Sequence, residues 1–397
     1  MKIITAISNL KNWQQIKLSS VATINMGQSP PSSAYNEIND GLPLIQGNID
    51  IKRDKTISRI WTKNTTKVAD KGDIILTVRA PVGALGIAHE RVCLGRGVCS
   101  IKSDYKSFIW YYLKYFKDKW NILEQGSTFS AVNSTDIRNL KIDLPSFAEQ
   151  SRIVAVLEKW DKAIEKLKKK IEIKKQIKKG LMHELLTGKI RLERHKDPWV
   201  TTTLGEVSGF VNGYTFKSST YTENGSYMVI TIANVQDGQM VIDEPKTIRD
   251  LPENINKDQV LQKGDLLISM TGNVGRVCIV DRNFCLLNQR VGKIKERGLS
   301  RELLYFILND RRFLNKMIDS AQGGAQGNLS TTDIKKYSFK IPKSKEEQHD
   351  ITNILTTANN EIRILERKFN ILQGQKKYLL NNLITGTIRT PENLLVS

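Results

Sequence analysis

The sequence has few cysteines and no long apolar segment. Four cysteines occur among 397 residues without Cys-x-x-Cys spacing, so neither a zinc site nor a disulfide framework is indicated. We expect Cys93 and Cys285 to be small buried hydrophobic residues. No apolar run approaches the roughly 20 residues that span a bilayer, and Met1–Thr5 does not begin a signal peptide. These absences predict a reduced, cytoplasmic protein that makes no use of a membrane.

Recognisable catalytic motifs are also missing. The four histidines lie neither in His-Glu-x-x-His nor beside a plausible nucleophile, and Gly188-Lys189 lacks the rest of a phosphate-binding loop. There is no Gly-x-Gly-x-x-Gly that opens a helix, no Asp/Asn-Pro-Pro-aromatic motif of an amino-methyltransferase, and no nuclease-like carboxylate cluster. The sequence therefore predicts a binding protein that is not an enzyme and holds no cofactor or metal.

Basic residues are in large excess. Lys and Arg number 61 against 41 Asp and Glu, which gives a net charge of +20 and a pI of about 9.6. Such an excess indicates a polyanionic partner, either nucleic acid or an acidic membrane surface. Part of the excess lies in one lysine run. The run is either a solvated helix face, or a surface that binds phosphates or an acidic partner. Its members are Lys159, Lys162, Lys166, Lys168, Lys169, Lys170, Lys174, Lys175, Lys178 and Lys179.

The strongest pattern is an internal repeat. The segment Ser146–Arg191 recurs 198 positions later as Ser344–Arg389. Both copies open with Ser-x-x-Glu-Gln and close on Thr-Gly-x-Ile-Arg. A tandem duplication predicts two similar halves related by a pseudo-two-fold axis. Duplex DNA has nearly the same symmetry.

Each copy is predicted to form one long helix. Ser-x-x-Glu is a capping box, in which the Glu side chain reaches back to the Ser backbone, and Gly188 and Gly386 are predicted to end the helices. Lys174, Lys178 and Lys376 interrupt the apolar seam. The alternative is an ordinary amphipathic helix on a globular core. Apolar residues spaced alternately four and three positions apart favour two paired helices instead. These seam residues are Ile153, Leu157, Trp160, Ile164, Leu167, Ile171, Leu181 and Leu185 in the first copy, and Ile351, Leu355, Ala358, Ile362, Leu365, Phe369, Leu372, Leu379 and Leu383 in the second.

The connection between the helices predicts their direction. The second globular half begins near Trp199 and ends near Pro342. If this second half is compact, its two ends lie close together. The second helix then starts near the point where the first ends, so the pair is antiparallel. From Ile153 to Leu185 the helix rises roughly 48 Å, more than one turn of DNA at about 34–36 Å.

The segments outside the helices also match each other, more weakly. Lys71–Leu76 aligns with Lys263–Ile268, and Gly126–Ile137 with Gly323–Ile334. Short strands beside Gly turns, and amphipathic helices over 108–120 and 301–317, predict a mixed globule. The expected fold is α+β, with two pseudo-symmetric globules separated by an antiparallel pair of long helices. The predicted boundaries are 1–145, 146–190, 191–342 and 343–390.

Two kinds of segment are candidates for reading DNA bases. One is a small, polar loop in each half, and the other is a pair of Arg residues in the first half, answered by Asn, Gln and Arg residues in the second. Arg pairs with guanine, Asn and Gln pair with adenine, and Ser and Thr pair with several bases. The alternatives are plain flexible connections and surface ion pairs. The candidate residues are Ser127, Thr128, Asn133, Gln326 and Asn328 in the loops, and Arg79, Arg96, Asn273, Arg276, Gln289 and Arg290 in the clusters.

Taken together, the chain resembles the specificity subunit of a type I restriction–modification system. The resemblance covers nearly the whole length and rests on the order globule–helix–globule–helix. It also rests on Leu144-Pro145…Glu149-Gln150 and Ile341-Pro342…Glu347-Gln348, on Leu-Leu-Thr-Gly and Leu-Ile-Thr-Gly, and on Ser/Thr-Thr-Asp-Ile before each helix.

The resemblance implies two target-recognition domains, each reading half of an interrupted site in double-stranded DNA, with the helices as a ruler for the gap. It also implies two methylation subunits, which bind S-adenosylmethionine, and two restriction subunits, which use ATP and Mg²⁺. Two rival hypotheses remain: a basic coiled-coil adaptor for proteins or an acidic surface, and a stand-alone DNA-modifying enzyme.

Overall fold

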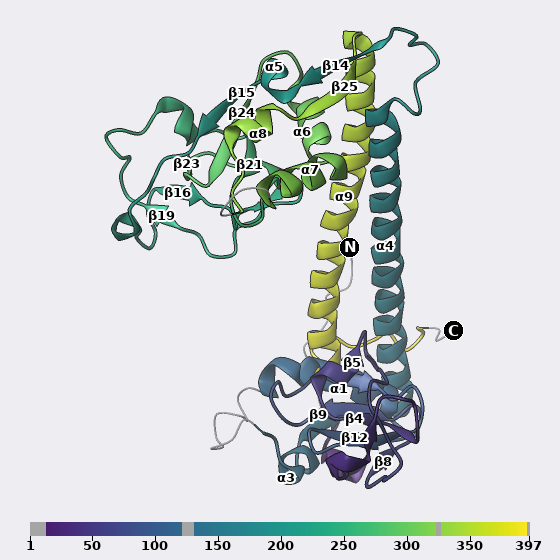
Figure 1. Ribbon diagram of the computed structural model, residues 1–397. Coiled ribbons are helices and arrows are strands. Elements are labelled where there is room, and N and C mark those ends of the chain that lie inside the picture. Colours follow the sequence, from purple (N-terminus) through teal and green to yellow (C-terminus); the bar gives the residue numbers. More distant parts are fainter. Residues whose placement is uncertain (1–12, 121–130, 323–326, 395–397) are drawn as a thin grey trace. The chain divides into compact units, whose positions relative to one another are not determined.

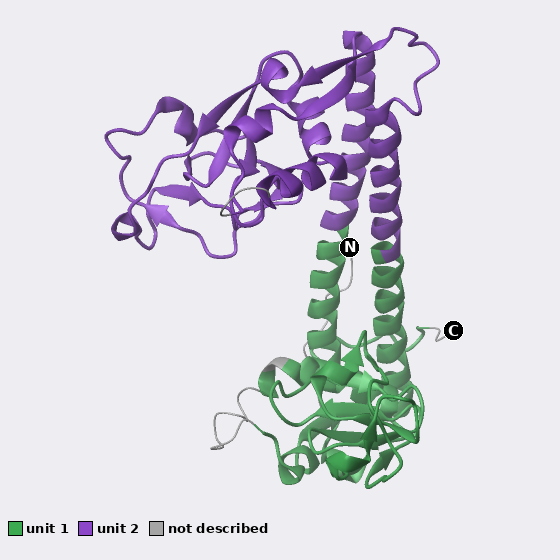
Figure 2. Cartoon of the chain, viewed as in Figure 1, with its two compact units in different colours: residues 1–168, 368–397 green, residues 169–367 purple. Residues whose placement is uncertain are grey.

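The computed structural model describes residues 13–120, 131–322 and 327–394. The chain forms two compact units, one from Met1–Lys168 and Lys368–Ser397 and the other from Lys169–Arg367 (Figure 2). Each unit combines a globule of short strands and helices with part of two long helices, α4 (Phe147–Thr187) and α9 (Lys345–Ile384) (Figure 1). The predicted α+β fold with two similar globules and a pair of long helices is confirmed.

Unit 1 holds two sheets and one short ribbon. A six-stranded sheet has the order β2-β12-β9-β10-β6-β5, a five-stranded sheet has the order β3-β7-β4-β11-β8, and β1 pairs with β13. The elements are β1 (Gln14–Lys17), β2 (Thr23–Met26), β3 (Tyr35–Asn36), β4 (Leu42–Ile45), β5 (Ile51–Lys52), β6 (Lys55–Thr56), β7 (Trp61–Thr62), β8 (Val68–Ala69), β9 (Ile74–Thr77), β10 (Leu85–Ile87), β11 (Val92–Leu94), β12 (Val98–Lys102), α1 (Lys106–Phe116), α3 (Ser134–Arg138) and β13 (Lys141–Leu144).

Unit 2 repeats this plan with smaller sheets. The orders are β15-β24-β21-β22 and β19-β16-β23-β20, and β14-β25 and β17-β18 are two-stranded. The elements are β14 (Trp199–Thr203), α5 (Leu204–Val207), β15 (Ser208–Asn212), β16 (Tyr227–Ile230), β17 (Val235–Gln236), β18 (Gln239–Met240), β19 (Thr247–Ile248), β20 (Val260–Leu261), β21 (Leu266–Ser269), β22 (Val277–Ile279), β23 (Cys285–Leu287), β24 (Val291–Glu296), α6 (Arg301–Leu308), α7 (Arg311–Gln322), α8 (Thr331–Lys335) and β25 (Ser338–Pro342).

The predicted helix over 301–317 is divided in two. Helix α6 ends at Leu308 and α7 begins at Arg311. The Asp310 carboxylate accepts a hydrogen bond from the Arg312 backbone N–H at 2.9 Å, which caps α7. An aspartate that caps a new helix start therefore outweighs the continuous apolar pattern.

Each unit has its own core, to which both long helices contribute. In unit 1, Ile153 and Leu157 of α4 join Leu383 and Ile384 of α9 among the buried residues. In unit 2, the buried residues include Met182 and Leu185 of α4 with Ile351 and Leu355 of α9. The first turns of one helix thus share a core with the last turns of the other, so the helices are antiparallel. They pair with each other and also cover the globules, and therefore both interpretations of the apolar stripe hold.

The lysines that interrupt the seam find partners on the opposite helix. In unit 1 the Lys376 ammonium binds the Asp161 carboxylate. In unit 2 the matching pair is Lys178 Nζ with Asn359 Oδ1 at 2.6 Å, and Lys174 Nζ lies 2.8 Å from Glu361 Oε1. Burial lowers the pKa of Lys178, since its direct partner carries no charge. These polar pairs satisfy the seam and favour one register between the helices.

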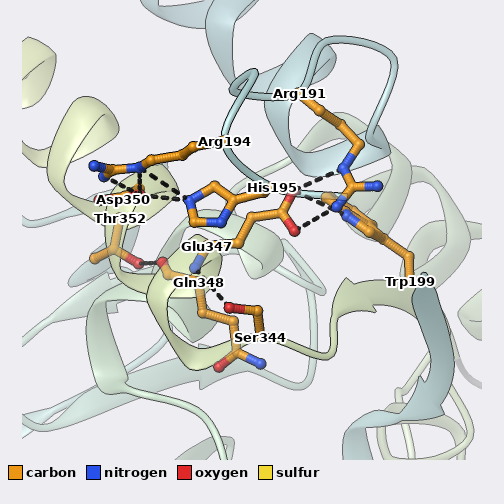
Figure 3. A network of polar contacts seen from close by, with 9 residues as sticks. All are labelled: Arg191, Arg194, His195, Trp199, Ser344, Glu347, Gln348, Asp350 and Thr352. Carbon is orange, nitrogen blue, oxygen red and sulfur yellow. Dashed lines mark hydrogen bonds and ion pairs between the residues drawn. The ribbon is translucent and has the colours of Figure 1, made fainter. Parts of the chain in front are cut away.

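A second repeated contact joins both helices to the first strand of each globule. In unit 2 the Glu347 carboxylate is 1% exposed and accepts hydrogen bonds from Arg191 Nε at 2.9 Å, Arg191 Nη2 at 2.7 Å and Trp199 Nε1 at 3.2 Å (Figure 3). Arg191 follows α4, Glu347 begins α9 and Trp199 opens β14. We call this arrangement the clasp.

Unit 1 has the same clasp. The Glu149 carboxylate binds the Arg389 guanidinium, with 2.6 Å between Oε2 and Nη2, and accepts from Trp13 Nε1 at 3.1 Å. Gly386, which ends α9 at φ 73°, packs against the Trp13 ring, as Gly188 packs against the Trp199 ring. The glycine and arginine that close each repeat thus belong to one contact.

The capping-box prediction is only half right. Ser146 Oγ and Ser344 Oγ each accept from the backbone N–H of the Glu three residues later, at 3.4 Å. The Glu side chains do not complete the box, because the guanidinium and indole donors of the clasp take their carboxylates. A charged hydrogen bond to arginine is stronger than one to a neutral backbone N–H.

The mirrored seam pairs predict the effect of one substitution. Asn359→Asp should give Lys178 the carboxylate that Lys376 already has, raise the Lys178 pKa and stabilise the protein by about 1 kcal/mol. Urea unfolding measures the change. Asp161→Asn, the reciprocal control, should destabilise unit 1. A neutral or destabilising Asn359→Asp would show that the two pairs are not equivalent.

The clasp predicts a charge-dependent contribution to stability. Glu347→Gln keeps the shape and should cost about 2 kcal/mol, the low side for a buried pair because Arg191 is partly exposed. Burial raises the pKa of Glu347, but hydrogen bonds from Arg191 and Trp199 outweigh it, so the pKa stays below 4.5. The contribution should be complete above about pH 4.5 and lost as pH falls through the lowered pKa.

Unfolding measured at pH 7 and pH 4 tests this. The difference between wild type and Glu347→Gln should shrink at the lower pH. Glu346→Gln is the matched control, since Glu346 is an exposed neighbour in the same turn. An equal loss of stability in both variants would contradict a specific clasp.

Candidate nucleic-acid interface

In unit 1, polar side chains collect where β9 ends and β12 begins. The Val78 backbone N–H donates to the Gly97 carbonyl at 2.9 Å and so joins the two strand ends. Beside them is a hollow of about 150 Å³, lined by Ser29, Gln46, Gly47, Asn48, Arg79, Ala80, Arg96 and Gly97. Arg79 and Arg96 are both exposed. The structure therefore brings the predicted arginine pair together.

The hollow is positive and its wall is rigid. None of the described residues that line it is acidic. The Asp50 carboxylate is buried behind the wall, where it accepts from the Gln46 and Gly47 backbone N–H groups at 2.8 and 3.2 Å. A side chain at Gly97 would come within 2.1 Å of the Gln46 carbonyl oxygen. The glycine thus allows these two backbone segments to lie against each other.

Unit 2 has a corresponding strand end with different side chains. The Met270 backbone N–H donates to the Arg290 carbonyl at 3.0 Å, as Val78 does to Gly97. Asn273, Gln289 and Arg290 are exposed here. Three of the four predicted residues of this cluster thus present donors and acceptors to solvent.

Arg276, the fourth, is held by neighbouring side chains. Its guanidinium donates to the Gln236 amide oxygen and lies 3.5 Å from the Asp237 carboxylate. Both partners sit at the turn between β17 and β18. Arg276 thus makes the surface ion pair that was the alternative for this cluster.

Val132, near the end of the first predicted loop, and Leu329, directly after the second, are joined to these strand ends. The Val132 N–H donates to the Val78 carbonyl at 2.9 Å, and the Leu329 N–H donates to the Met270 carbonyl at 2.8 Å. Asn133 caps α3, because its Oδ1 accepts from the Asp136 N–H at 3.0 Å. Asn328 is exposed. Ser127, Thr128 and Gln326 lie outside the described residues.

Sequence reasoning missed several residues of this interface. Ser29, Gln46 and Asn48 line the unit 1 hollow, and Gln236 holds Arg276 in unit 2. The run Gln46-Gly47-Asn48 is a polar, Gly-containing turn directly after a buried strand, which is the signal that points to it.

Cys93 and Cys285 are buried, as predicted. All four cysteines are buried and free, and burial raises the pKa of Cys99 and Cys278 to about 12, which makes them unreactive. The described residues contain no cluster of metal-ligating side chains. Across the same residues, no helix has both the length and the apolar character to cross a membrane.

The lysine run on α4 divides by position. Lys174 and Lys178 point into the seam, and Lys175 Nζ pairs with Glu366 at 2.7 Å, while most of the others are exposed. Part of the run therefore stabilises the helix pair within unit 2, and the rest of the run is exposed.

Comparisons with known proteins agree with this geometry. Residues 10–175 and 196–373 each match the family model of the type I restriction modification DNA specificity domain. The MjaVIII specificity subunit of Methanocaldococcus jannaschii, a type I restriction enzyme subunit, is 25% identical over 412 residues, with 96% of this chain and 93% of that protein covered. The MjaX specificity subunit of the same organism is 39% identical over 189 residues, which covers 46% of this chain and 44% of that protein.

A solved structure shares the fold. The type I restriction–modification S subunit from Mycoplasma genitalium superposes with a TM-score of 0.58 at 17% identity, and the match covers 96% of this chain and 98% of that one. Since both halves match the family model over most of the length, the chain belongs to the type I restriction–modification specificity subunits, the non-catalytic members of these systems.

Proposed function

We propose that each unit reads one half of a bipartite, interrupted site in double-stranded DNA. The observation that carries this proposal is the shared strand end with unlike side chains. Unit 1 presents Arg79 and Arg96 there, whereas unit 2 presents Asn273, Gln289 and Arg290. Arginine suits guanine and the amides suit adenine. Two different half-sites require the same backbone arrangement in both units, with different side chains to contact the bases.

The two long helices are proposed to set the gap between the half-sites. Helix α4 has 41 residues, which corresponds to about 61 Å. The seam pairs fix the register of α4 against α9 in each unit. In this proposal, the length of the antiparallel helix pair sets the distance between the two globules at its ends, and so the length of the gap.

The exposed faces of the helices support docking of methylation subunits. Ile173 on α4 and Ile371 on α9 occupy equivalent repeat positions and are 60% and 51% exposed, with Ile177, Ile364 and Tyr378 also exposed. Exposed apolar side chains that group on a helix surface favour a protein interface. The equivalent pair Ile173 and Ile371 favours two copies of the partner. Those subunits would bind S-adenosylmethionine, and the restriction subunits would use ATP and Mg²⁺.

The proposal is tested by co-expression with a methylation subunit encoded nearby, followed by single-molecule sequencing for methylated bases. A bipartite, interrupted motif is expected. If no complex with the methylation subunit forms, and the chain binds a protein partner with no dependence on salt, a basic adaptor becomes the better account.

Loss of one reading group should affect one half-site only. Arg96→Ala should relax or abolish recognition of a guanine in one half, at about 1–3 kcal/mol of discrimination, and leave the other half unchanged. The methylated motif is the readout. Arg91→Ala is the matched control, because Arg91 is exposed in the same unit and does not line the hollow. Altered recognition in both halves would contradict independent reading.

The ruler predicts a change of spacing. Asp161 pairs with Lys376 across the helices, which places Leu167 opposite Asn370. One heptad inserted after each of these positions keeps the seam in register and adds about 10.5 Å, or about three base pairs of gap at 3.4 Å each. The half-sites should stay the same. An unchanged gap in a folded, active complex would rule the ruler out, and insertion in α4 alone serves as the misregistered control.

A further inference from the structure

Unit 2 contains a basic hollow that takes no part in the clasp. It is also separate from the strand end that carries Asn273, Gln289 and Arg290, which we call the reading edge, as we do the matching strand end with Arg79 and Arg96 in unit 1. The hollow measures about 670 Å³ and lies between the end of α4, helices α7 and α8, and β25. Four basic residues line it: Arg312, Lys316, Lys336 and Lys340. The only acidic residue among its described lining residues is Asp333, whose carboxylate accepts from the Ser330 N–H at 3.3 Å in the cap of α8.

Three of these charges have no carboxylate partner. Lys316, Lys336 and Lys340 are exposed and form no ion pair or hydrogen bond through their side chains within the described residues. Arg312 is held in place, because its Nε donates to Asp310 at 2.7 Å and its Nη2 to the Leu186 carbonyl at 3.5 Å. The hollow therefore concentrates uncompensated positive charge on a fixed frame.

The wall of the hollow is aromatic and well packed. The Tyr337 and Phe339 rings stack with centroids 5.6 Å apart, and Tyr337 meets Phe313 edge to face at 4.9 Å. These rings hold Lys336 and Lys340 on a rigid strand and turn. The backbone that carries these two lysines is therefore fixed, and their exposed ammonium groups can turn toward a phosphate.

At four matching positions, unit 1 has neither the lysines nor the aromatic rings of this hollow. The Leu18 N–H donates to the Leu140 carbonyl, as the Leu204 N–H donates to the Tyr337 carbonyl. On that alignment, unit 1 has Asn139, Leu140, Ile142 and Asp143 where unit 2 has Lys336, Tyr337, Phe339 and Lys340. Neither the lysines nor the aromatic rings are needed to build the globule, so their presence in unit 2 calls for a function.

We propose that this hollow binds backbone phosphates of the DNA duplex beside the half-site that unit 2 reads. Helix α7, which carries Arg312 and Lys316, packs against the loop that carries Asn273, because a side chain at Gly275 would come within 2.7 Å of the Met317 Cβ. One helix thus carries two of the basic residues and also supports the reading edge. Protein interfaces are depleted in lysine, whereas lysine contacts to phosphate are common and independent of sequence. The inference rests on the proposed DNA recognition and adds that the two units contribute unequally to backbone affinity.

The test uses the complex with the methylation subunit and the triple variant Lys316→Gln, Lys336→Gln and Lys340→Gln. The dissociation constant for cognate and unrelated duplexes is measured by fluorescence anisotropy across a salt series. The slope of log affinity against log salt should fall by about 2–3, near 0.9 for each lost phosphate contact. Affinity should fall roughly tenfold or more for both duplexes, and the methylated motif should stay the same.

The control is a second triple variant with the same change of charge. Lys246, Lys257 and Lys263 are exposed in unit 2 but do not line the hollow. Equal slopes for the two triple variants would overturn the phosphate site. Loss of the methylation subunit from the first triple variant, seen by size-exclusion chromatography, would also overturn it and assign the hollow to a protein. A wild-type complex that shows no salt-dependent DNA binding would instead defeat the proposed function itself.

Discussion

The buried carboxylate of the clasp is the contact on which each unit depends. Glu149 and Glu347 are nearly inaccessible. Each is paired with an arginine that follows the opposite helix and accepts a hydrogen bond from a tryptophan indole at the start of the globule. One carboxylate thereby fixes the start of one helix, the end of the other and the edge of the globule. Removing its partners would leave an unpaired buried charge, which a protein of ordinary stability tolerates poorly.

Around this fixed frame the two units differ in what they present to solvent. The backbone contact between Val78 and Gly97 recurs between Met270 and Arg290, so the reading edge is placed by main-chain hydrogen bonds rather than by side chains. Side chains at that edge are free to change without cost to the fold. The same holds for the basic hollow of unit 2, whose residues at 336, 337, 339 and 340 differ from those at the matching positions of unit 1. A duplicated scaffold of this kind can carry two different surfaces.

Much of the frame could be predicted because it is encoded locally. The repeat, the helix ends at Gly188 and Gly386 and the apolar stripe follow from spacing alone. The partners of the clasp carboxylates could not be predicted in this way. A capping box is a local pattern, whereas Arg191 and Glu347 meet only after 156 residues of chain fold between them.

The interface could be predicted only in part, for a similar reason. Arg79 and Arg96 follow and precede neighbouring strands, so their grouping could be predicted from the sequence, but Gln46 and Asn48 come from another strand. Asn133 and Arg276 hold local structure, through partners that only the fold brings to them.

The most direct test of the account is to replace the second globule, residues 199–342, by a copy of the first, residues 13–145, and to sequence the methylated sites made by the resulting complex. Because each globule is clasped in the same way to an antiparallel helix pair, the two half-sites should become inverted repeats of one sequence across a gap of unchanged length. A motif that keeps its original second half, or one whose halves repeat in the same direction, would contradict two equivalent, independently reading units.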